Sequence, residues 1–189
     1  HIKPTYEVVA SDYTKKAAIF LQVDNKNEYD RIMPIGLPKS DFIINYLRKS
    51  REEIFEAVSV KNLPNMAVKD KLILFLPTWR EDKNFNIFGY SYKPKIFDEI
   101  LSRNDAFMIV NFHPFDEFER LNKMNKMGDR ICVTSYSSDE ILRLLCAADV
   151  FITDYSSLFS DYLLLDRPII FCKFSHEKYT RERDLQISY

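Results

Sequence analysis

The segment ADVFITDYSSLFSDYLLLDRPIIFC, from Ala148 to Cys172, places carboxylates and hydroxyls between two apolar runs. Asp154, Ser156 and Ser157 directly follow the first run, and Asp161 lies one helical turn further on. Hydroxyls at the start of a helix add hydrogen-bond donors to unpaired backbone N–H groups, and the combination favours an anion. The same residue types are also ordinary helix caps. The segment alone therefore supports two interpretations, an anion-binding loop and a simple N-cap.

Three more apolar runs end in residues that could hold an anion. Thr78 and Arg80 follow LILFL, His113 follows MIVNF, and Lys39 lies just after MPIG. The planar guanidinium of arginine suits phosphate, and a histidine can serve as a base or as a phosphate ligand. Each residue alone also has a structural explanation, an ion pair for Arg80 and a hydrogen-bonded structural histidine for His113. Together the four strand ends carry the groups needed to bind a phosphorylated ligand.

The elements that must position these residues alternate between strand and helix. KLILFLP (71–77) and AFMIVNF (106–112) are continuous apolar runs, which are typical of strands buried on both faces. The alternation predicts an α/β fold, a Rossmann-like parallel sheet with helices on both faces. In such sheets ligands bind beyond the carboxyl ends of the strands. We therefore expect Arg80, His113 and Ser156 to cluster on one edge of the sheet.

The chain length of 189 residues fits one domain over 1–189, or one domain with an appendage. The first expected helix is preceded by Ser11 or Asp12 as cap, and Ser137 with Glu140 forms the pattern of a capping box. Strands are expected at 6–11, 31–36, 71–77, 106–112, 130–135, 150–153 and 167–172. Helices are expected at 13–21, 40–58, 94–101, 115–124, 140–148 and 157–165, with a long loop at 81–92.

Composition excludes several classes of protein. The net charge of −1 argues against a general nucleic-acid binder. No segment approaches the ~18 consecutive apolar residues of a membrane span. The chain has only 3 glycines, too scattered for a G-x-G-x-x-G or P-loop fingerprint, so any phosphate site is built without glycine.

Cysteine and motif spacing exclude further chemistries. Cys132, Cys146 and Cys172 have no C-x-x-C spacing and no nearby histidine, which predicts reduced core thiols of a cytoplasmic protein. The sequence thus predicts neither a metal site nor a cofactor. A serine hydrolase would need G-x-S-x-G, and a haloacid-dehalogenase-type phosphatase would need an Asp where Ser156 stands. Group transfer from a nucleotide-activated donor remains.

Five segments of the chain resemble one known family, in that family's order and at plausible spacing. They are GLPKSD (36–41), LPTWRE (76–81), NFHP (111–114), ADVFITDYSSLFSDY (148–162) and RPIIF (167–171). The family is that of the CDP-glycerol glycerophosphotransferases, bacterial transferases of teichoic-acid and related capsular polymer biosynthesis. Each segment is modest alone, whereas five in order are specific.

The resemblance implies a GT-B architecture, two Rossmann-like domains facing a cleft, of which this chain resembles the C-terminal, donor-nucleotide-binding one. It implies that His113 is catalytic or orients the phosphate. The candidate donor and phosphate ligands are Arg80, Thr78, Asp154, Ser156, Ser157, Asp161 and Lys39. Asp161 could also be a solvated helix residue or a residue that orients the loop. The family usually has Arg in place of Lys39. The family's N-terminal domain, with a W-H-G-like segment, is not in this sequence, so we expect a fragment that is inactive alone.

The function that the resemblance implies is transfer of a polyol phosphate, with glycerol phosphate as the expected group, from a CDP-activated donor to a growing teichoic-acid-like or capsular polymer. The expected partners are the CDP-polyol and a lipid-linked acceptor held by the missing domain, without nucleic acid. We expect a cytoplasmic location, at the cytoplasmic face of the membrane, with membrane contact only through parts outside this chain. Two alternatives stay open: a sugar-transferring GT-B enzyme with a UDP or CMP donor, and a non-catalytic nucleotide-binding module.

Overall fold

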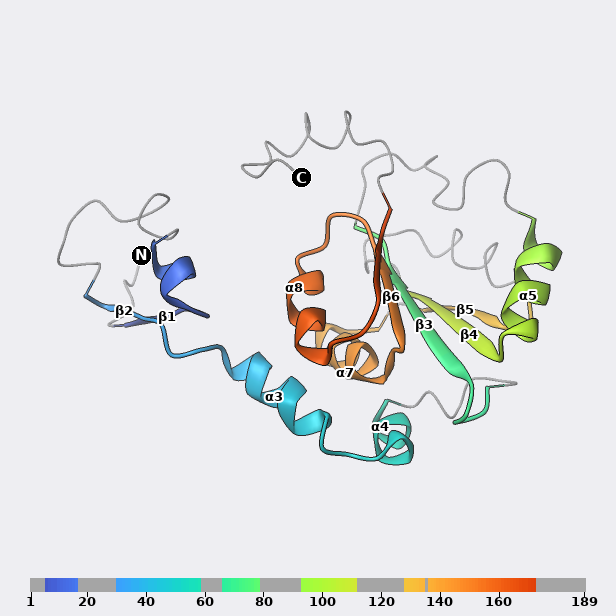
Figure 1. Ribbon diagram of the computed structural model, residues 1–189, viewed down its shortest axis with the longest axis horizontal. Helices are drawn as coiled ribbons and strands as arrows, with labels where there is room; N and C mark the ends of the chain where they lie inside the picture. The colour runs from blue at the N-terminus through green and yellow to red at the C-terminus, as the bar shows by residue number, and fades with distance from the viewer. Residues whose placement is uncertain are drawn as a thin grey trace. The chain divides into compact units, whose positions relative to one another are not determined.

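A computed structural model describes residues 6–16, 30–58, 66–78, 93–111, 128–134 and 136–172 (Figure 1). The chain divides into two compact units, residues 1–45 and residues 46–189. The single domain predicted over 1–189 therefore stays a prediction, and each unit is described by itself. Among the described residues, no helix has both the length and the apolar character needed to cross a bilayer.

The first unit contains a small parallel sheet. Strand β1 (Glu7–Val8) pairs with β2 (Ile32–Met33), in the register Glu7 opposite Ile32. A helical segment at 12–16 follows β1, and the Ser11 hydroxyl accepts the Thr14 N–H at 3.3 Å, as the sequence predicted for a cap at this point. Helix α3 (Pro38–Tyr46) follows β2, and Lys39 lies exposed in its first turn.

The second unit is built on a five-stranded sheet in which every pair of neighbouring strands is parallel. Its strands are β3 (Lys71–Leu76), β4 (Ala106–Asn111), β5 (Ile131–Thr134), β6 (Val150–Thr153) and β7 (Ile169–Phe171). The spatial order is β5-β4-β3-β6-β7 (Figure 1). The chain thus adds strands outward from β3 in one direction, then returns to its other side with β6.

Helices cover both faces of this sheet. Helix α5 (Pro94–Arg103) packs on one face, where Leu101 joins Phe75, Met108 and Val110 in a cluster of buried side chains and the half-buried Phe97 packs against it. Phe151, whose neighbour Ile152 lies against that cluster, faces the other side because side chains alternate along a strand. On that side Phe151 packs against Tyr162 of helix α8 (Leu158–Tyr162), with ring centroids 5.2 Å apart. Both faces are therefore buried, as the continuous apolar runs predicted.

Two helices differ from the sequence prediction. The helix expected over 40–58 is two helices, α3 and α4 (Arg51–Ala57), because Ser50 starts a new one. Ser50 Oγ accepts the Glu53 N–H at 3.2 Å, and the Glu53 carboxylate accepts the Ser50 N–H at 2.7 Å. The helix expected over 157–165 is the short α8 followed by a 3-10 turn, η2 (Leu163–Leu165). The capping box predicted at Ser137 and Glu140 is confirmed at the start of helix α7 (Ser138–Ala147).

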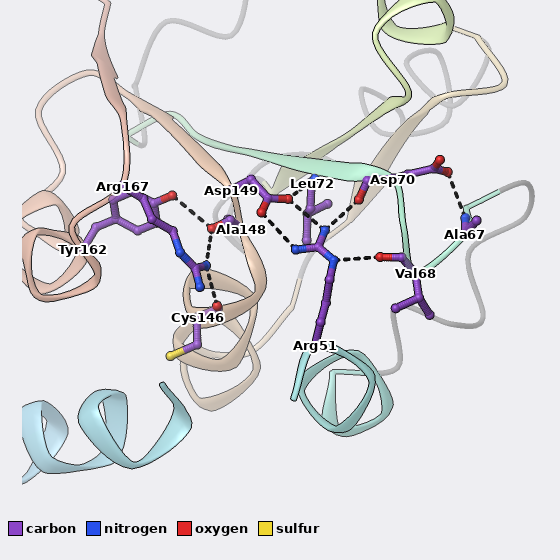
Figure 2. A network of polar contacts seen from close by, with 10 residues as sticks. All are labelled: Arg51, Ala67, Val68, Asp70, Leu72, Cys146, Ala148, Asp149, Tyr162 and Arg167. Atoms are coloured by element: carbon purple, nitrogen blue, oxygen red, sulfur yellow. Dashed lines mark hydrogen bonds and ion pairs between the residues drawn. The ribbon is translucent and has the colours of Figure 1, made fainter. Parts of the chain in front are cut away.

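A polar network closes the amino edge of the sheet (Figure 2). The Arg51 guanidinium donates to both Asp149 oxygens, at 2.9 and 2.8 Å, and to the backbone carbonyls of Val68 and Asp70, at 2.7 and 2.6 Å. Asp149 in turn accepts the Leu72 N–H at 2.7 Å. Helix α4 is thereby fixed to the starts of β3 and β6.

A second arginine at the same edge holds the end of α7. Arg167 Nη1 donates to the carbonyls of Cys146 and Ala148, at 2.8 and 2.6 Å, and the Tyr162 hydroxyl also donates to Ala148 at 3.0 Å (Figure 2). A cation beside the last carbonyls of a helix is favourable, since they are unpaired and carry the negative end of the helix dipole. The arginine of the RPIIF segment thus has a structural role, at the edge opposite the polar strand ends.

Candidate functional site

The order of the strands creates a switch point between β3 and β6. These strands are neighbours, yet the chain leaves β3 toward β4 and leaves β6 toward β7, in opposite directions across the sheet. Open α/β sheets bind ligands beyond the carboxyl ends of their strands at such a point, where the connections diverge. The segments that follow β3 and β6 both carry candidate residues from the sequence.

Asp154 joins these two segments directly. Its Oδ1 accepts the Thr78 N–H at 2.8 Å and its Oδ2 accepts the Thr78 hydroxyl at 2.9 Å, although the two residues are 76 positions apart. Oδ1 also accepts the Tyr155 N–H at 2.7 Å. Asp154 is only 6% exposed. Next to it the Thr153 hydroxyl donates to the Leu76 carbonyl at 2.9 Å, so the ends of β3 and β6 are tied by side chains as well as by the sheet.

A second buried polar residue ties the next pair of strand ends. Asn111, the last residue of β4, is 4% exposed, and its Oδ1 accepts the Thr134 hydroxyl at 2.9 Å and the Tyr136 N–H at 2.6 Å. Asn111 was not among the predicted site residues. The signal that could have identified it is the single amide inside the apolar run AFMIVNF, since a buried amide is normally retained for its hydrogen bonds.

The two adjacent serines after Asp154 have different environments. Ser156 is half-buried and its hydroxyl accepts the Leu158 N–H at 3.3 Å, as a cap would. Ser157 is exposed, has helical backbone angles and makes no capping hydrogen bond through its side chain. Asp161 is 5% exposed on α8. The N-cap interpretation therefore applies to Ser156, whereas Ser157 has no such structural role.

The Asp154 carboxylate also affects the ionisation of Cys172, which directly follows β7. Burial first, and then the nearby Asp154 carboxylate, raise the pKa of the Cys172 thiol, whose N–H donates to the Thr153 carbonyl at 2.8 Å. Burial likewise raises the pKa of Cys132 on β5. Raised pKa values keep these thiols protonated and therefore weakly nucleophilic. All three cysteines are free thiols, Cys146 buried and the other two half-buried.

The structure brings together four of the predicted site residues: Thr78, Asp154, Ser156 and Ser157 lie on the segments that follow β3 and β6. Lys39 belongs to the first unit. Arg80 and His113 lie outside the described residues, as does the helix expected at 115–124, so the clustering of Arg80, His113 and Ser156 stays a prediction. The described residues contain no group of three or more His, Cys, Asp or Glu side chains able to hold a metal ion.

Solved structures resemble this fold over nearly the whole chain. A variant of the wall teichoic acid polymerase TagF has a TM-score of 0.65 at 24% identity, covering 96% of this chain and 42% of that one. The UDP-GlcNAc 2-epimerase from Neisseria meningitidis has a TM-score of 0.54 at 12% identity, covering 88% and 44%. These likenesses confirm the predicted fold class, an α/β, Rossmann-like half of a GT-B architecture.

Sequence comparison identifies the family. The teichoic acid ribitol-phosphate polymerase TarL of Staphylococcus aureus (strain NCTC 8325 / PS 47) is 31% identical over 166 residues, 84% of this chain and 27% of that protein. The teichoic acid poly(glycerol phosphate) polymerase of Staphylococcus epidermidis (strain RP62A) is 27% identical over 157 residues, 80% of this chain and 20% of that protein. The chain thus spans well under half the length of these relatives. Its residues 2–189 match the family described as CDP-Glycerol:Poly(glycerophosphate) glycerophosphotransferase, and the chain belongs to that family.

Proposed function

We propose that this chain is the donor-binding part of a transferase that moves a polyol phosphate from a CDP-activated donor to a growing teichoic-acid-like or capsular polymer. The observation that carries the proposal is the switch point between β3 and β6, where Asp154 and Thr78 fix two segments to each other. Family membership supports the reaction class. The names of the relatives, polymerases and transferases of glycerol phosphate or ribitol phosphate, support a polyol phosphate as the group transferred.

In the proposed reaction an acceptor hydroxyl attacks the donor β-phosphorus. A new P–O bond forms to the acceptor, the P–O bond to CMP breaks, and CMP leaves while a base accepts the hydroxyl proton. Arg80 and the Ser156–Ser157 pair would stabilise the pyrophosphate charge, because phosphoryl transfer depends mainly on positioning and electrostatics. His113 is the group proposed to orient the donor phosphate or to deprotonate the acceptor hydroxyl. Asp161 and Lys39 are further candidates for binding the CDP-activated donor.

The remaining partners are part of the same proposal. The acceptor would be a lipid-linked polymer held by parts of the protein outside this chain, at the cytoplasmic face of the membrane. Positioning an acceptor in line with the phosphorus can account for ~7–11 kcal/mol of barrier lowering, and a donor domain alone does not hold the acceptor. We therefore expect this chain to bind the donor without transferring its polyol phosphate.

Calorimetry with four ligands tests the proposal: CDP-glycerol, CDP-ribitol, a UDP-sugar and a CMP-sugar. The chain should bind the two CDP-polyols and discriminate against the sugar nucleotides, and glycerol is expected to be preferred because the family description names glycerophosphate. CDPG has been soaked into crystals of a TagF variant, so a CDP-polyol is a practical probe for this family. Preference for a UDP-sugar would contradict the proposal. A second assay measures CMP release with CDP-glycerol and a lipid-linked acceptor, where turnover by this chain alone would contradict the donor-domain assignment.

A further inference from the structure

We infer that Asp154 is a positioning residue, acting through Thr78, rather than a ligand of the donor phosphates. The inference rests on the proposed function for its effect on donor binding, and on the contacts of Asp154 for its mechanism. It changes the role expected of Asp154 from the sequence, where the carboxylate was grouped with the residues that touch the donor.

The contacts of the carboxylate are directed into the protein. Among the described residues, the Thr78 N–H and hydroxyl and the Tyr155 N–H donate hydrogen bonds to it, with distances between 2.7 and 2.9 Å. Both oxygens take part, and the residue is 6% exposed. A carboxylate with this many short hydrogen bonds is held in one orientation, and so is the backbone of Thr78.

Electrostatics also opposes direct contact with a phosphate. An ionised carboxylate only accepts hydrogen bonds, and its charge repels a pyrophosphate at short range. The effect of Asp154 on the neighbouring Cys172 thiol has the same sign, since a negative charge disfavours forming another negative charge beside it. An acid at this place favours anion binding only if it organises groups that donate to the anion.

The position of the two residues in the sequence indicates which groups those are. Arg80 comes two residues after Thr78, and Ser156 comes two residues after Asp154. The hydrogen bonds between Thr78 and Asp154 therefore fix the distance between two segments where they begin. One segment carries Arg80 and the other carries Ser156 and Ser157. Protein groups that donate hydrogen bonds to the ligand lose less entropy on binding if they are already held in place.

Replacement by asparagine separates this role from any role that needs the charge. In Asp154→Asn the side-chain oxygen can still accept the Thr78 and Tyr155 N–H groups, and the new amide can donate to the Thr78 hydroxyl, which accepts as well as donates. Asp154→Ala removes all three contacts. Asp70→Ala is the matched control, because Asp70 is a buried acid (3% exposed) at the opposite edge of the same unit, bonded to the Ala67 N–H at 2.9 Å.

Two measurements on the 189-residue chain test the inference: the Kd for CDP-glycerol by calorimetry, and amide hydrogen exchange at Thr78 and Tyr155. We expect Asp154→Ala to raise the Kd about 10- to 100-fold, in line with the loss of bonds to a charged group. We expect Asp154→Asn and Asp70→Ala to keep the Kd within about 3-fold, a change of under one kcal/mol. Exchange at the two amides should accelerate at least about 10-fold in Asp154→Ala only, because only that variant loses their acceptor.

Three outcomes would overturn the inference. They are an Asp154→Asn variant as weak as Asp154→Ala, an Asp154→Ala variant that is folded and binds normally, and unchanged amide exchange in Asp154→Ala. A failure of the parent chain to bind any CDP-polyol would instead contradict the proposed function. The exchange measurement would still decide whether Asp154 holds Thr78, because it requires no ligand.

Discussion

Arg51 and Asp149, 98 residues apart in sequence, form a two-point ion pair that fixes helix α4 to the start of β6. Each side chain is 31% exposed, so the pair is intermediate between a surface and a buried salt bridge. Arg51 also stacks over the Phe55 ring at 4.5 Å. The planar fork makes contacts that lysine cannot reproduce.

We predict that Arg51→Ala lowers the free energy of unfolding by about 2 kcal/mol, between the values typical of exposed and of buried pairs. Arg51→Lys should lose about half of that, because it keeps the charge and loses the fork. Urea unfolding measures both. The control is Arg103→Ala, since Arg103 and Glu99 form an exposed pair at 3.8 Å. Equal losses at Arg51 and Arg103 would show that the amino-edge network is not a stabilising feature.

Substitutions of Ser156 and Ser157 should distinguish an effect on protein stability from an effect on donor binding. Ser156→Ala and Ser157→Ala are each predicted to weaken donor binding about 10- to 100-fold, because each removes a donor to a charged group. Only Ser156→Ala should also lower stability, by about 1 kcal/mol, because the Ser156 hydroxyl accepts the Leu158 N–H. Ser160→Ala is the control, as the Ser160 hydroxyl donates to the Ser157 carbonyl at 2.7 Å. Calorimetry and thermal melts would contradict the binding role if Ser157→Ala and Ser160→Ala bind alike.

Stability is predicted to fall at alkaline pH through a buried thiol. Burial, opposed in part by Arg167, raises the pKa of Cys146 from 9.0 to about 11. The unfolded chain therefore loses this proton first, so the stabilisation is complete below pH 9 and is lost as the pH rises to about 11. The pKa of Tyr162 is also raised, chiefly by burial, and acts in the same direction. Cys146→Ala should make the loss of stability between these pH values shallower, and an unchanged slope would contradict the assignment.

Gly128→Ala is predicted to destabilise the protein. Its φ is +153°, and an added Cβ would lie 2.5 Å from Asp98 Oδ1, which accepts the Arg130 N–H at 2.8 Å. Gly128→Ala should lower the free energy of unfolding by about 1–3 kcal/mol, from backbone strain and from displacement of the Asp98 carboxylate. In an Asp98→Ala background the same substitution should be less destabilising, since the contacts at 2.5 and 2.7 Å are removed and only the Cβ of residue 98, at 3.0 Å, remains. Additive losses in urea unfolding would show that the contact with Asp98 is not the cause.

The sequence predicted the strands of the sheet well and some helix boundaries poorly. The apolar runs predicted at 71–77 and 106–112 correspond closely to β3 (Lys71–Leu76) and β4 (Ala106–Asn111), because doubly buried strands require uninterrupted apolar residues. The helix expected over 40–58 was wrong at Ser50, where a capping box outweighed the helical periodicity. Helix periodicity continues across such a break, so the pattern alone does not reveal it.

The site was predicted by residue type rather than by contact. Thr78 and Asp154 were both candidates, but their direct bond depends on β6 lying beside β3, and strand order is not contained in the pattern of any one segment. Asn111 lies in the NFHP segment of the family resemblance, but it was missed as a site residue because its apolar neighbours indicated only a strand. The sequence grouped Asp154 with the donor ligands, whereas we infer a positioning role, because a polar residue at a strand end is the same signal for a ligand and for a residue that positions one.

The adjacency of β3 and β6 also has a consequence for how the chain folds. The contacts β3–β4, β4–β5 and β6–β7 each join strands that follow one another in the chain, whereas β3 and β6 meet only after β4 and β5 have intervened. Closing the larger loop costs more entropy, so we expect this pairing to form last. The candidate site lies where residues 71–134, which we expect to pair early, meet residues 138–171. A ligand that contacts both halves would therefore stabilise the product of the last folding step. The measured affinity for the CDP-activated donor would then depend on whether β3 and β6 have paired.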